Sequence, residues 1–243
     1  MRILYAAVVL GVAAIICFII FGSAFRYKSK STETIVVTGL AEKDFVSDLI
    51  VWNGSYSRKS LDLKGAYASL KQDENVIRQY LIGKGIADTE MVFSAVEINK
   101  EFNHRTDMDG RSLGQEFSGY NLSQSVRVES KDVNKVEKIS REVTELIESS
   151  IEFNSSPPLY YYSKLSDIKI DLLAKASADA KERAETIAKN SGSSLGNLKK
   201  ANMGIFQITG KNSNEDYSYG GTFNTRDKNK TGSITIKMEF AAD

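Results

Sequence analysis

Cysteine, proline and histidine are all scarce in this chain of 243 residues, which has one cysteine, two prolines and one histidine. The only cysteine, Cys17, lies in an apolar run near the N-terminus. The remaining chain can therefore form neither a disulfide framework nor a thiolate metal cluster. A domain without cysteine suits any redox compartment, so cysteine usage does not locate the protein.

An excess of charge of one sign is missing as well. Lys and Arg total 32 and Asp and Glu total 31, which gives a formal net charge of +1. No broad basic field is available for nucleic acid, and we expect no nucleic-acid partner. The glycines match neither the P-loop pattern nor the dinucleotide-binding pattern, so nucleotide binding has no support. A composition of 42% hydrophobic and 26% charged residues is typical of a globular protein with a real core.

The longest uncharged run covers residues 3–25. A membrane span needs about 20 apolar residues, whereas the apolar core of an export signal has about 7 to 15. We therefore predict an uncleaved transmembrane anchor over residues 1–26 and a polar linker over residues 27–33. Small residues at positions 22–24 keep open the alternative of a cleaved export signal.

Basic residues around this run give only a weak signal for its orientation. Arg2 and the terminal amine precede it, and three basic residues follow it, which slightly favours a cytoplasmic domain. A chain that enters the export pathway behind an N-terminal apolar segment would nevertheless carry its large domain across the membrane. We expect a single-pass inner-membrane protein with the large domain in the periplasm, or a protein secreted to the periplasm if the segment is cleaved.

The clearest folding signal lies in residues 162–209. Apolar residues recur there at steps of three or four positions: Leu165, Ile168, Leu172, Leu173, Ala176, Ala180, Ala184, Ile187 and Ala188. This spacing predicts a helix of about six turns, ended by Asn190, Ser191 and Gly192. This face has large residues at its start and is mostly alanine afterwards, so the helix can lie unusually close to a sheet. A strand over residues 203–209 should follow.

Strand and helix patterns alternate through the rest of the chain. Strands are predicted over residues 34–39, 45–57, 91–102, 117–129 and 233–240, with helices over residues 61–83 and after an Asp132 cap. A turn over residues 41–44 should join the first two strands, the second of which we expect in the sheet interior. Residues 103–115 are interpreted as a solvated hairpin loop and residues 211–230 as a mobile loop.

Two prolines, Pro157 and Pro158, place the extended residues 151–162 at a sheet edge or a crossing. The element order β β α β β α β α β β predicts an α+β domain over residues 34–243, with a mainly antiparallel sheet covered by helices.

Candidate site residues are few. Asp48 lies on the second predicted strand, where it is either a buried acid with a role or, as we favour, a carboxylate satisfied by a nearby turn. His104 lies near Asp107 and Asp109, which could form a divalent-ion loop or an acid–base pair. The sequence after Gly110 does not continue the ligand pattern of a calcium loop, so a solvated turn is favoured.

Three consecutive tyrosines, Tyr160, Tyr161 and Tyr162, alternate across an extended segment, so at least one ring should face outward. We interpret them as sheet packing, with an interface contact as the alternative. No residue is assigned a catalytic, cofactor-binding or metal-binding role, and no cofactor is expected.

Two segments carry a resemblance to a known family. They are VTGLAEKDFVSDLIVW (residues 37–52) and YSKLSDIKIDLLAKASADAKERAETIAKNSGSSLGNLKKANMGIFQI (residues 162–208). Together with the last short strand, they resemble the SIMPL domain family, and more closely its membrane-anchored bacterial branch. Members are mostly exported or envelope proteins, related to periplasmic immunogenic proteins and proteins of oxidative-stress defence, and one relative forms a hollow ring-like oligomer. The resemblance implies an α+β fold and supplies no catalytic residues. The chain departs from the family pattern in the loop over residues 211–230, which is longer than expected. The resemblance therefore does not predict an assembly contact near the last hairpin.

The resemblance implies a non-enzymatic envelope protein that binds the membrane through its N-terminal helix, forms a homo-oligomer and contributes to stress tolerance or envelope integrity. The alternative is an envelope ligand-binding protein or enzyme, with a pocket between helices and sheet and Asp48 or His104 as candidates. The ligand would be a small molecule of unknown identity.

Overall fold

The computed structural model describes residues 11, 14–22 and 33–242. Most of the predicted anchor and nearly all of the linker lie outside the described residues. Residues 14–22 are helical, and their large apolar side chains are exposed. In the part of the chain that is described, no helix is long and apolar enough to cross a membrane.

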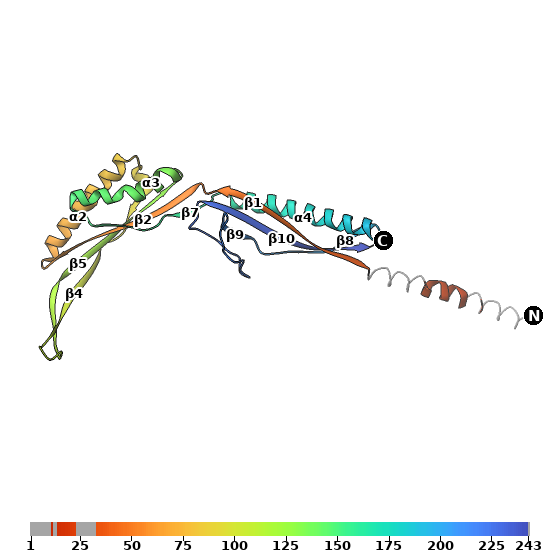
Figure 1. Cartoon of the computed structure of the whole chain (residues 1–243), viewed down its shortest axis with the longest axis horizontal. Coiled ribbons are helices and arrows are strands. Elements are labelled where there is room, and N and C mark those ends of the chain that lie inside the picture. The colour runs from red at the N-terminus through yellow and green to blue at the C-terminus, as the bar shows by residue number, and fades with distance from the viewer. Residues whose placement is uncertain (1–10, 12–13, 23–32, 243) are drawn as a thin grey trace, which may run out of the picture.

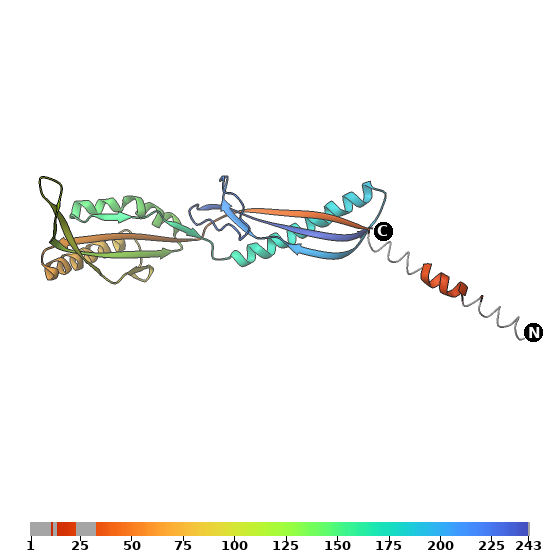
Figure 2. The same cartoon turned by 90° about the horizontal axis from the view of Figure 1, so that it is seen from below.

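Residues 33–242 form two lobes that lie end to end (Figures 1 and 2). We name them lobe A, built on one antiparallel sheet, and lobe B, built on another. Each lobe has its own cluster of buried apolar residues. The α+β class is confirmed, but the single sheet that we predicted is two sheets.

Lobe A has β10 at the centre of its sheet, with β1 on one side and β8 and β9 on the other. Its elements are β1 (Thr34–Val46), α4 (Leu165–Asn190), β8 (Leu195–Met203), β9 (Gln207–Gly210) and β10 (Asn229–Ala242). Helix α4 covers one face of the sheet (Figure 1).

Lobe B has β5 and β2 as its central pair. Its strands are β2 (Leu49–Ser60), β3 (Met91–Phe93), β4 (Glu97–Thr106), β5 (Ser112–Ser130), β6 (Phe153–Ser155) and β7 (Leu159–Tyr161). Its helices are α2 (Leu63–Gly83), η1 (Asp88–Glu90), α3 (Val133–Glu142) and η2 (Val143–Ser149). Both α2 and α3 lie on the same face of this sheet (Figure 1).

The bounds predicted for α4 are confirmed, and so is most of its buried face, but Leu165 and Leu173 are only half-buried and Ile187 is exposed. The buried residues are Ile168, Leu172, Ala176, Ala180, Ala184 and Ala188, and Gly192 follows the helix with φ of 77°. Because alanine leaves room, the helix lies so close to β1 that a Cβ on Gly39 would be 2.2 Å from the carbonyl oxygen of Ala176.

The predicted turn at residues 41–44 is wrong. Strand β1 continues through these residues, paired with β10, and the break falls at Ser47 and Asp48, where the chain passes from lobe A to lobe B. The reason is tertiary: a charged surface strand and a turn have the same composition, and only pairing with β10, far away in sequence, decides between them. Strand β2 is interior, as predicted, because β5 lies on one side and β6 and β7 on the other.

Two further segments differ from the prediction. Residues 103–115 are mostly strand, since β4 reaches Thr106 and β5 begins at Ser112, which leaves a turn of only five residues. The strand predicted over residues 203–209 is instead the end of β8 and the start of β9. Helix α2, the Asp132 cap of α3 and the edge position of the proline segment agree with the prediction.

Two chain crossings and several polar contacts join the lobes. The crossings are the β1–β2 link at Ser47 and Asp48 and the link between β7 and α4. The ammonium of Lys228, just before β10, donates to Glu137 of α3 at 2.9 Å. The amide of Tyr160 donates to the carbonyl of Thr225 at 2.7 Å. The rings of Tyr161 in β7 and Phe223 also face each other, so the lobes meet through hydrogen bonds and this aromatic contact, and each retains a separate apolar core.

Candidate functional site

Asp48 lies at the crossing between the lobes. Its Oδ1 accepts the backbone N–H of Ser163 at 2.7 Å, and its Oδ2 accepts the Ser163 hydroxyl at 2.6 Å. Both carboxylate oxygens have partners at the start of the segment that leads into α4. The interpretation of Asp48 as a carboxylate satisfied by a nearby turn is confirmed.

His104 is placed differently from the prediction, because it lies on strand β4 opposite Gln115 and not in a turn. Asp107 does begin the turn, where its Oδ1 accepts the amides of Asp109 at 3.0 Å and Arg111 at 2.8 Å. His104 is exposed and close to the side-chain amide of Gln115. Among the described residues, no group of three or more potential ligands could hold a metal ion.

The three tyrosines pack within the structure. Tyr160 is buried in lobe B, while Tyr161 and Tyr162 are half-buried. The ring centroid of Tyr161 lies 6.5 Å from that of Phe223, and the ring of Tyr162 lies 4.9 Å from that of Phe45. The packing interpretation accounts for all three rings.

Sequence reasoning missed a buried acidic pair on α2, formed by Asp73 and Glu74. The guanidinium of Arg58 on β2 donates to both oxygens of Asp73 and, at 2.9 Å, to the carbonyl of Ser150. The sequence does contain a signal for this buried pair. Positions 73 and 74 lie three and four residues after Leu70 and before Ile77, on the same buried face of α2.

Glu74 belongs to a second branch of this network. Its Oε2 accepts from Lys71 at 2.9 Å and from Gln124 at 3.2 Å, and Gln124 accepts the Tyr56 hydroxyl at 2.6 Å. Burial opposes ionisation of Glu74, but the hydrogen bonds from Lys71 and Gln124 outweigh it and hold the pKa of Glu74 below its ordinary value. Burial, with Glu74 nearby, raises the pKa of Tyr56. These mutually satisfied groups stabilise lobe B and leave no free base or nucleophile in the network.

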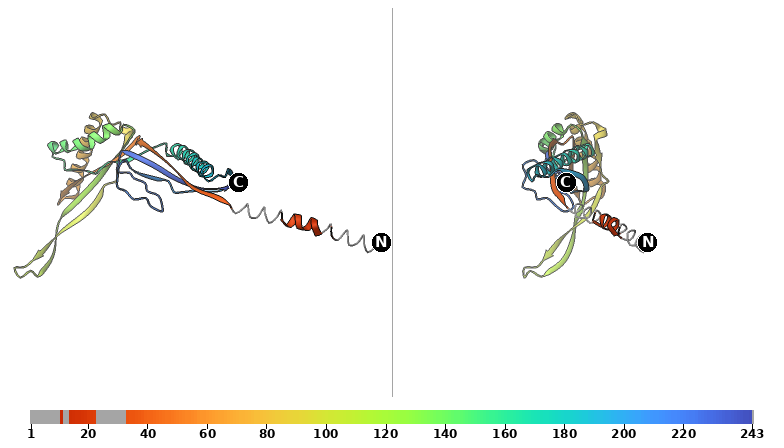
Figure 3. Two further views of the ribbon diagram at one scale, coloured as in Figure 1. Left: turned by 45° about the vertical axis from the view of Figure 1, so that its right-hand side comes forward. Right: turned by 90° about the vertical axis from the view of Figure 1, so that its right-hand side faces the viewer.

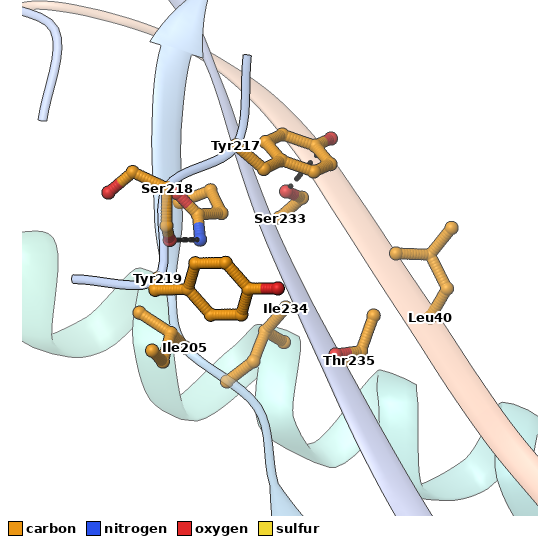
Figure 4. Close-up of a pocket in the computed structure, with 9 residues that line it drawn as sticks. Leu40, Ile205, Tyr217, Ser218, Tyr219, Ser233, Ile234 and Thr235 are labelled. Atoms are coloured by element: carbon orange, nitrogen blue, oxygen red, sulfur yellow. Dashed lines mark hydrogen bonds between the residues drawn. The ribbon is translucent and has the colours of Figure 1, made fainter. Parts of the chain in front are cut away.

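A concave pocket of about 270 Å³ lies in lobe A, on the face of the sheet opposite α4 (Figure 4). It is lined by Leu40, Ile205, Gln207, Tyr217, Ser218, Tyr219, Ser233, Ile234 and Thr235. The hydroxyls of Tyr217 and Ser233 are 3.2 Å apart, and the ring of Tyr219 is fully exposed. None of these lining residues is a carboxylate, amine, imidazole or thiol. The pocket therefore offers ring faces and hydroxyls for binding but no strong acid or base.

One wall of this pocket comes from residues 211–228, predicted as a mobile loop, which instead fold back onto β9. The side chain of Gln207 donates to the carbonyl of Ser218 at 2.9 Å and accepts the amide of Thr222 at 2.6 Å. Buried Asn224 donates to Glu215 at 2.6 Å and to Asp227 at 2.8 Å. These hydrogen bonds, made within the segment and to the neighbouring Gln207, give a polar sequence a defined conformation.

Lys230 on β10 is buried beneath the same segment, and its ammonium donates to the carbonyl of Asn224. Burial lowers the pKa of Lys230 to about 8, although Asp227 and Glu215 act in the opposite direction. The Lys230 amine therefore helps to hold residues 211–228 in place as a wall of the pocket. Lys230 itself is not among the residues that line the pocket.

The β4–β5 hairpin forms an arm that projects from lobe B (Figures 1 and 3). Along one face of this arm lie Ile98, Phe102, Phe117 and Tyr120, with ring centroids 5.8 Å apart for Phe102 and Phe117 and 5.1 Å apart for Phe117 and Tyr120. The first three are 55%, 48% and 39% exposed. Alternation along the strands places polar residues such as Glu101 on the other face. Lys100, paired with Tyr120, and His104 share the first face, so the arm has an unburied face that is mainly apolar and is interrupted by these two residues.

Comparison with protein families gives one match. Residues 35–239 match the model of SIMPL, described as a protein of unknown function (DUF541). No curated protein matches the chain. The matched residues include both lobes, the pocket of lobe A and the β4–β5 arm.

Proposed function

The chain belongs to the SIMPL family, and from this premise we propose that it is a non-enzymatic cell-envelope protein whose α+β domain acts by binding further copies of itself. The observation that carries this proposal is the apolar face of the β4–β5 arm. An isolated two-stranded hairpin is marginally stable in water, and contiguous exposed apolar side chains mark interaction sites. A second copy offers the arm a matching apolar face.

Charge does not oppose such an assembly. The formal net charge of +1 leaves little electrostatic repulsion between copies. A pocket lined by hydroxyls and rings, without carboxylate, amine, imidazole or thiol groups, supports a binding role over a catalytic one. In this proposal the assembly contributes to stress tolerance or envelope integrity.

The same proposal places the protein at the inner membrane, as a single-pass protein with its large domain in the periplasm. Support comes from the uncharged run of residues 3–25 and from the exposed apolar side chains of the helical residues 14–22. Cleavage of this segment and release into the periplasm is the alternative. A reporter of a kind that works only in the cytoplasm is fused to the C-terminus as the test. Activity of this fusion would contradict both the anchored and the released periplasmic placement.

Self-association is tested by the mass of the full chain in mild detergent, measured by light scattering after size-exclusion chromatography. We expect a discrete oligomer that Phe102→Asp dissociates, because a carboxylate on the apolar face cannot be buried without a partner. Asn103→Asp is the matched control, since it adds the same charge on the opposite, polar face. A monomeric wild type, or equal masses for the two variants, would refute the role of the arm.

A second candidate function is ligand binding in the pocket of Figure 4. The specific observation is the exposure of two tyrosines of the pocket lining, since Tyr217 is 60% exposed and Tyr219 is 100% exposed. This pocket lies on the open face of the sheet and not between helices and sheet, where the alternative function was expected to be. Aromatic faces beside hydroxyls suit a small planar or sugar-like molecule. Ligand screening by thermal shift, with Tyr219→Ala as the variant that should lose the response, tests this function.

A further inference from the structure

Strand β1 forms one edge of the lobe A sheet, because β10 is its only strand partner in the described chain. A groove of about 580 Å³ runs along this edge between β1 and α4. It is lined by Val36, Val37 and Thr38 from the strand and by Asp179, Glu182, Arg183, Thr186 and Ile187 from the helix. A sheet edge beside a helix is the geometry in which an extended peptide can add as a further strand.

The register of β1 shows which backbone groups face this groove. The amide of Ala242 donates to the carbonyl of Glu33 at 3.1 Å, so odd-numbered residues of β1 bond with β10 and even-numbered residues point away from it. The amide of Leu40 agrees, because it donates outward to Asp179 Oδ2 at 2.8 Å. Val36 and Thr38 therefore direct their N–H and C=O groups into the groove, where no described residue bonds them.

We propose that this groove binds a short extended peptide by strand addition to residues 36–38 of β1. Val36 and Ile187 are 49% and 47% exposed, and they provide apolar surface for the aliphatic side chains of such a peptide. Asp179 forms an ion pair with Arg183 at 2.9 Å, whereas the carboxylate of Glu182 has no hydrogen bond or ion pair within the described chain. The groove therefore has an unbalanced negative charge and selects peptides that combine aliphatic residues with a basic one.

The length of the open edge favours a short peptide over the edge strand of a second copy. Asp179 already occupies the amide of Leu40, so pairing cannot continue past Thr38 without breaking that bond. Further along the edge, β1 carries the consecutive charged residues Glu42, Lys43 and Asp44, and Lys43 forms an ion pair with Asp171 of α4 at 2.8 Å. Charged residues at an edge oppose long strand pairing. An opening of this length accommodates about three to five peptide residues at roughly 3.3 Å each.

The proposal is tested with the full chain in lipid nanodiscs, against a random heptapeptide library displayed on phage. Selected sequences, made as fluorescein-labelled peptides, are then measured by fluorescence polarisation. Val36→Pro removes one outward N–H that β10 does not use, and proline is tolerated at strand edges in that position. We expect it to weaken binding about tenfold, because a peptide carbonyl loses its partner. Val36→Thr, which keeps the N–H, is the matched control and should bind as the wild type does.

A second variant keeps the test decisive if Val36→Pro misfolds. Glu182→Lys changes an exposed helix residue and should shift the selected peptides from basic to acidic. Recovery of no peptide, or peptides whose affinity neither variant changes, overturns the proposal. A change in oligomer mass with Val36→Pro would also overturn it by assigning this edge to a second copy. Failure of the arm to assemble copies leaves these outcomes unaffected, since the arm belongs to lobe B.

Discussion

Replacing Gly39 by alanine is expected to push α4 away from the sheet of lobe A. The added Cβ would lie 2.2 Å from the carbonyl oxygen of Ala176, 2.6 Å from the amide nitrogen of Ala180 and 2.7 Å from its Cβ. These atoms belong to the helix backbone or are fixed to it, so no side-chain rotation relieves the overlap. Since ordinary contacts begin at 3.4 Å, the helix or the strand must move by about 1 Å.

The cost of this movement follows from overpacking and from one hydrogen bond. Extra methyl groups in a packed interior cost about 1–3 kcal/mol. Movement of α4 also weakens the bond from the Leu40 amide to Asp179, which adds about 1 kcal/mol. Alanine also restricts the unfolded chain more than glycine does, and this stabilises the variant by roughly 0.4–1 kcal/mol. We expect a net loss of about 1–3.5 kcal/mol from the unfolding free energy of lobe A.

Hydrogen exchange of the full chain, followed by mass spectrometry, resolves the two lobes in one experiment. Gly39→Ala should increase exchange in β1, β10 and α4 and leave β2, β5 and α2 unchanged, because the lobes have separate cores. Gly83→Ala is the matched control, since nothing lies within 4 Å of the added atom. Equal exchange in the two variants would refute the close approach of helix and strand. Equal loss of protection in both lobes would refute the separation of their cores.

Three further changes test the polar contacts of the fold. Arg58→Met leaves the buried carboxylate of Asp73 without its partner and should lower the unfolding free energy by about 3 kcal/mol, measured by urea unfolding. The double variant with Arg58→Met and Asp73→Leu should recover most of that loss, because no buried charge remains unpaired. Lys230 has its pKa lowered to about 8 from an ordinary value of 10.5, so between these pH values the unfolded chain binds more protons and stability rises with pH. Lys230→Met should remove up to about 1.4 kcal/mol per pH unit from that slope, and identical slopes in a pH series of melting curves would contradict the burial of a charged amine. Asp48→Ala removes both hydrogen-bond acceptors of Ser163 and should raise hydrogen exchange at the Ser163 amide. Unchanged hydrogen exchange at this amide would contradict the role of Asp48 in holding the two lobes together.

Local sequence predicted the helices well, since their signals lie within a few turns of chain. The three- and four-residue spacing of α4, the Asp132 cap of α3 and the glycine after α4 are all local features, and each appears in the structure. The alanine face even predicted the close approach to a sheet, which Gly39 then provides from a distant strand.

The strands and the candidate sites were predicted less completely. Residues 41–44 resemble a turn in composition, but their pairing with β10 makes them strand. The β4–β5 arm contains polar and charged residues that suggest a loop, because one of its faces is polar. The pocket of lobe A needs residues 40, 205–219 and 233–235 together, and no local pattern links them.

Local sequence was enough to predict the α+β class, the family and the positions of the long helices, because periodicity, capping and residue identity act over short distances. Tertiary structure alone decided that there are two sheets and not one, that β1 and β2 belong to different lobes, and that an apolar arm and an open strand edge remain unpaired in the described chain. Strand pairing joins residues far apart along the chain, so which edges are filled depends on the whole fold and not on any one segment.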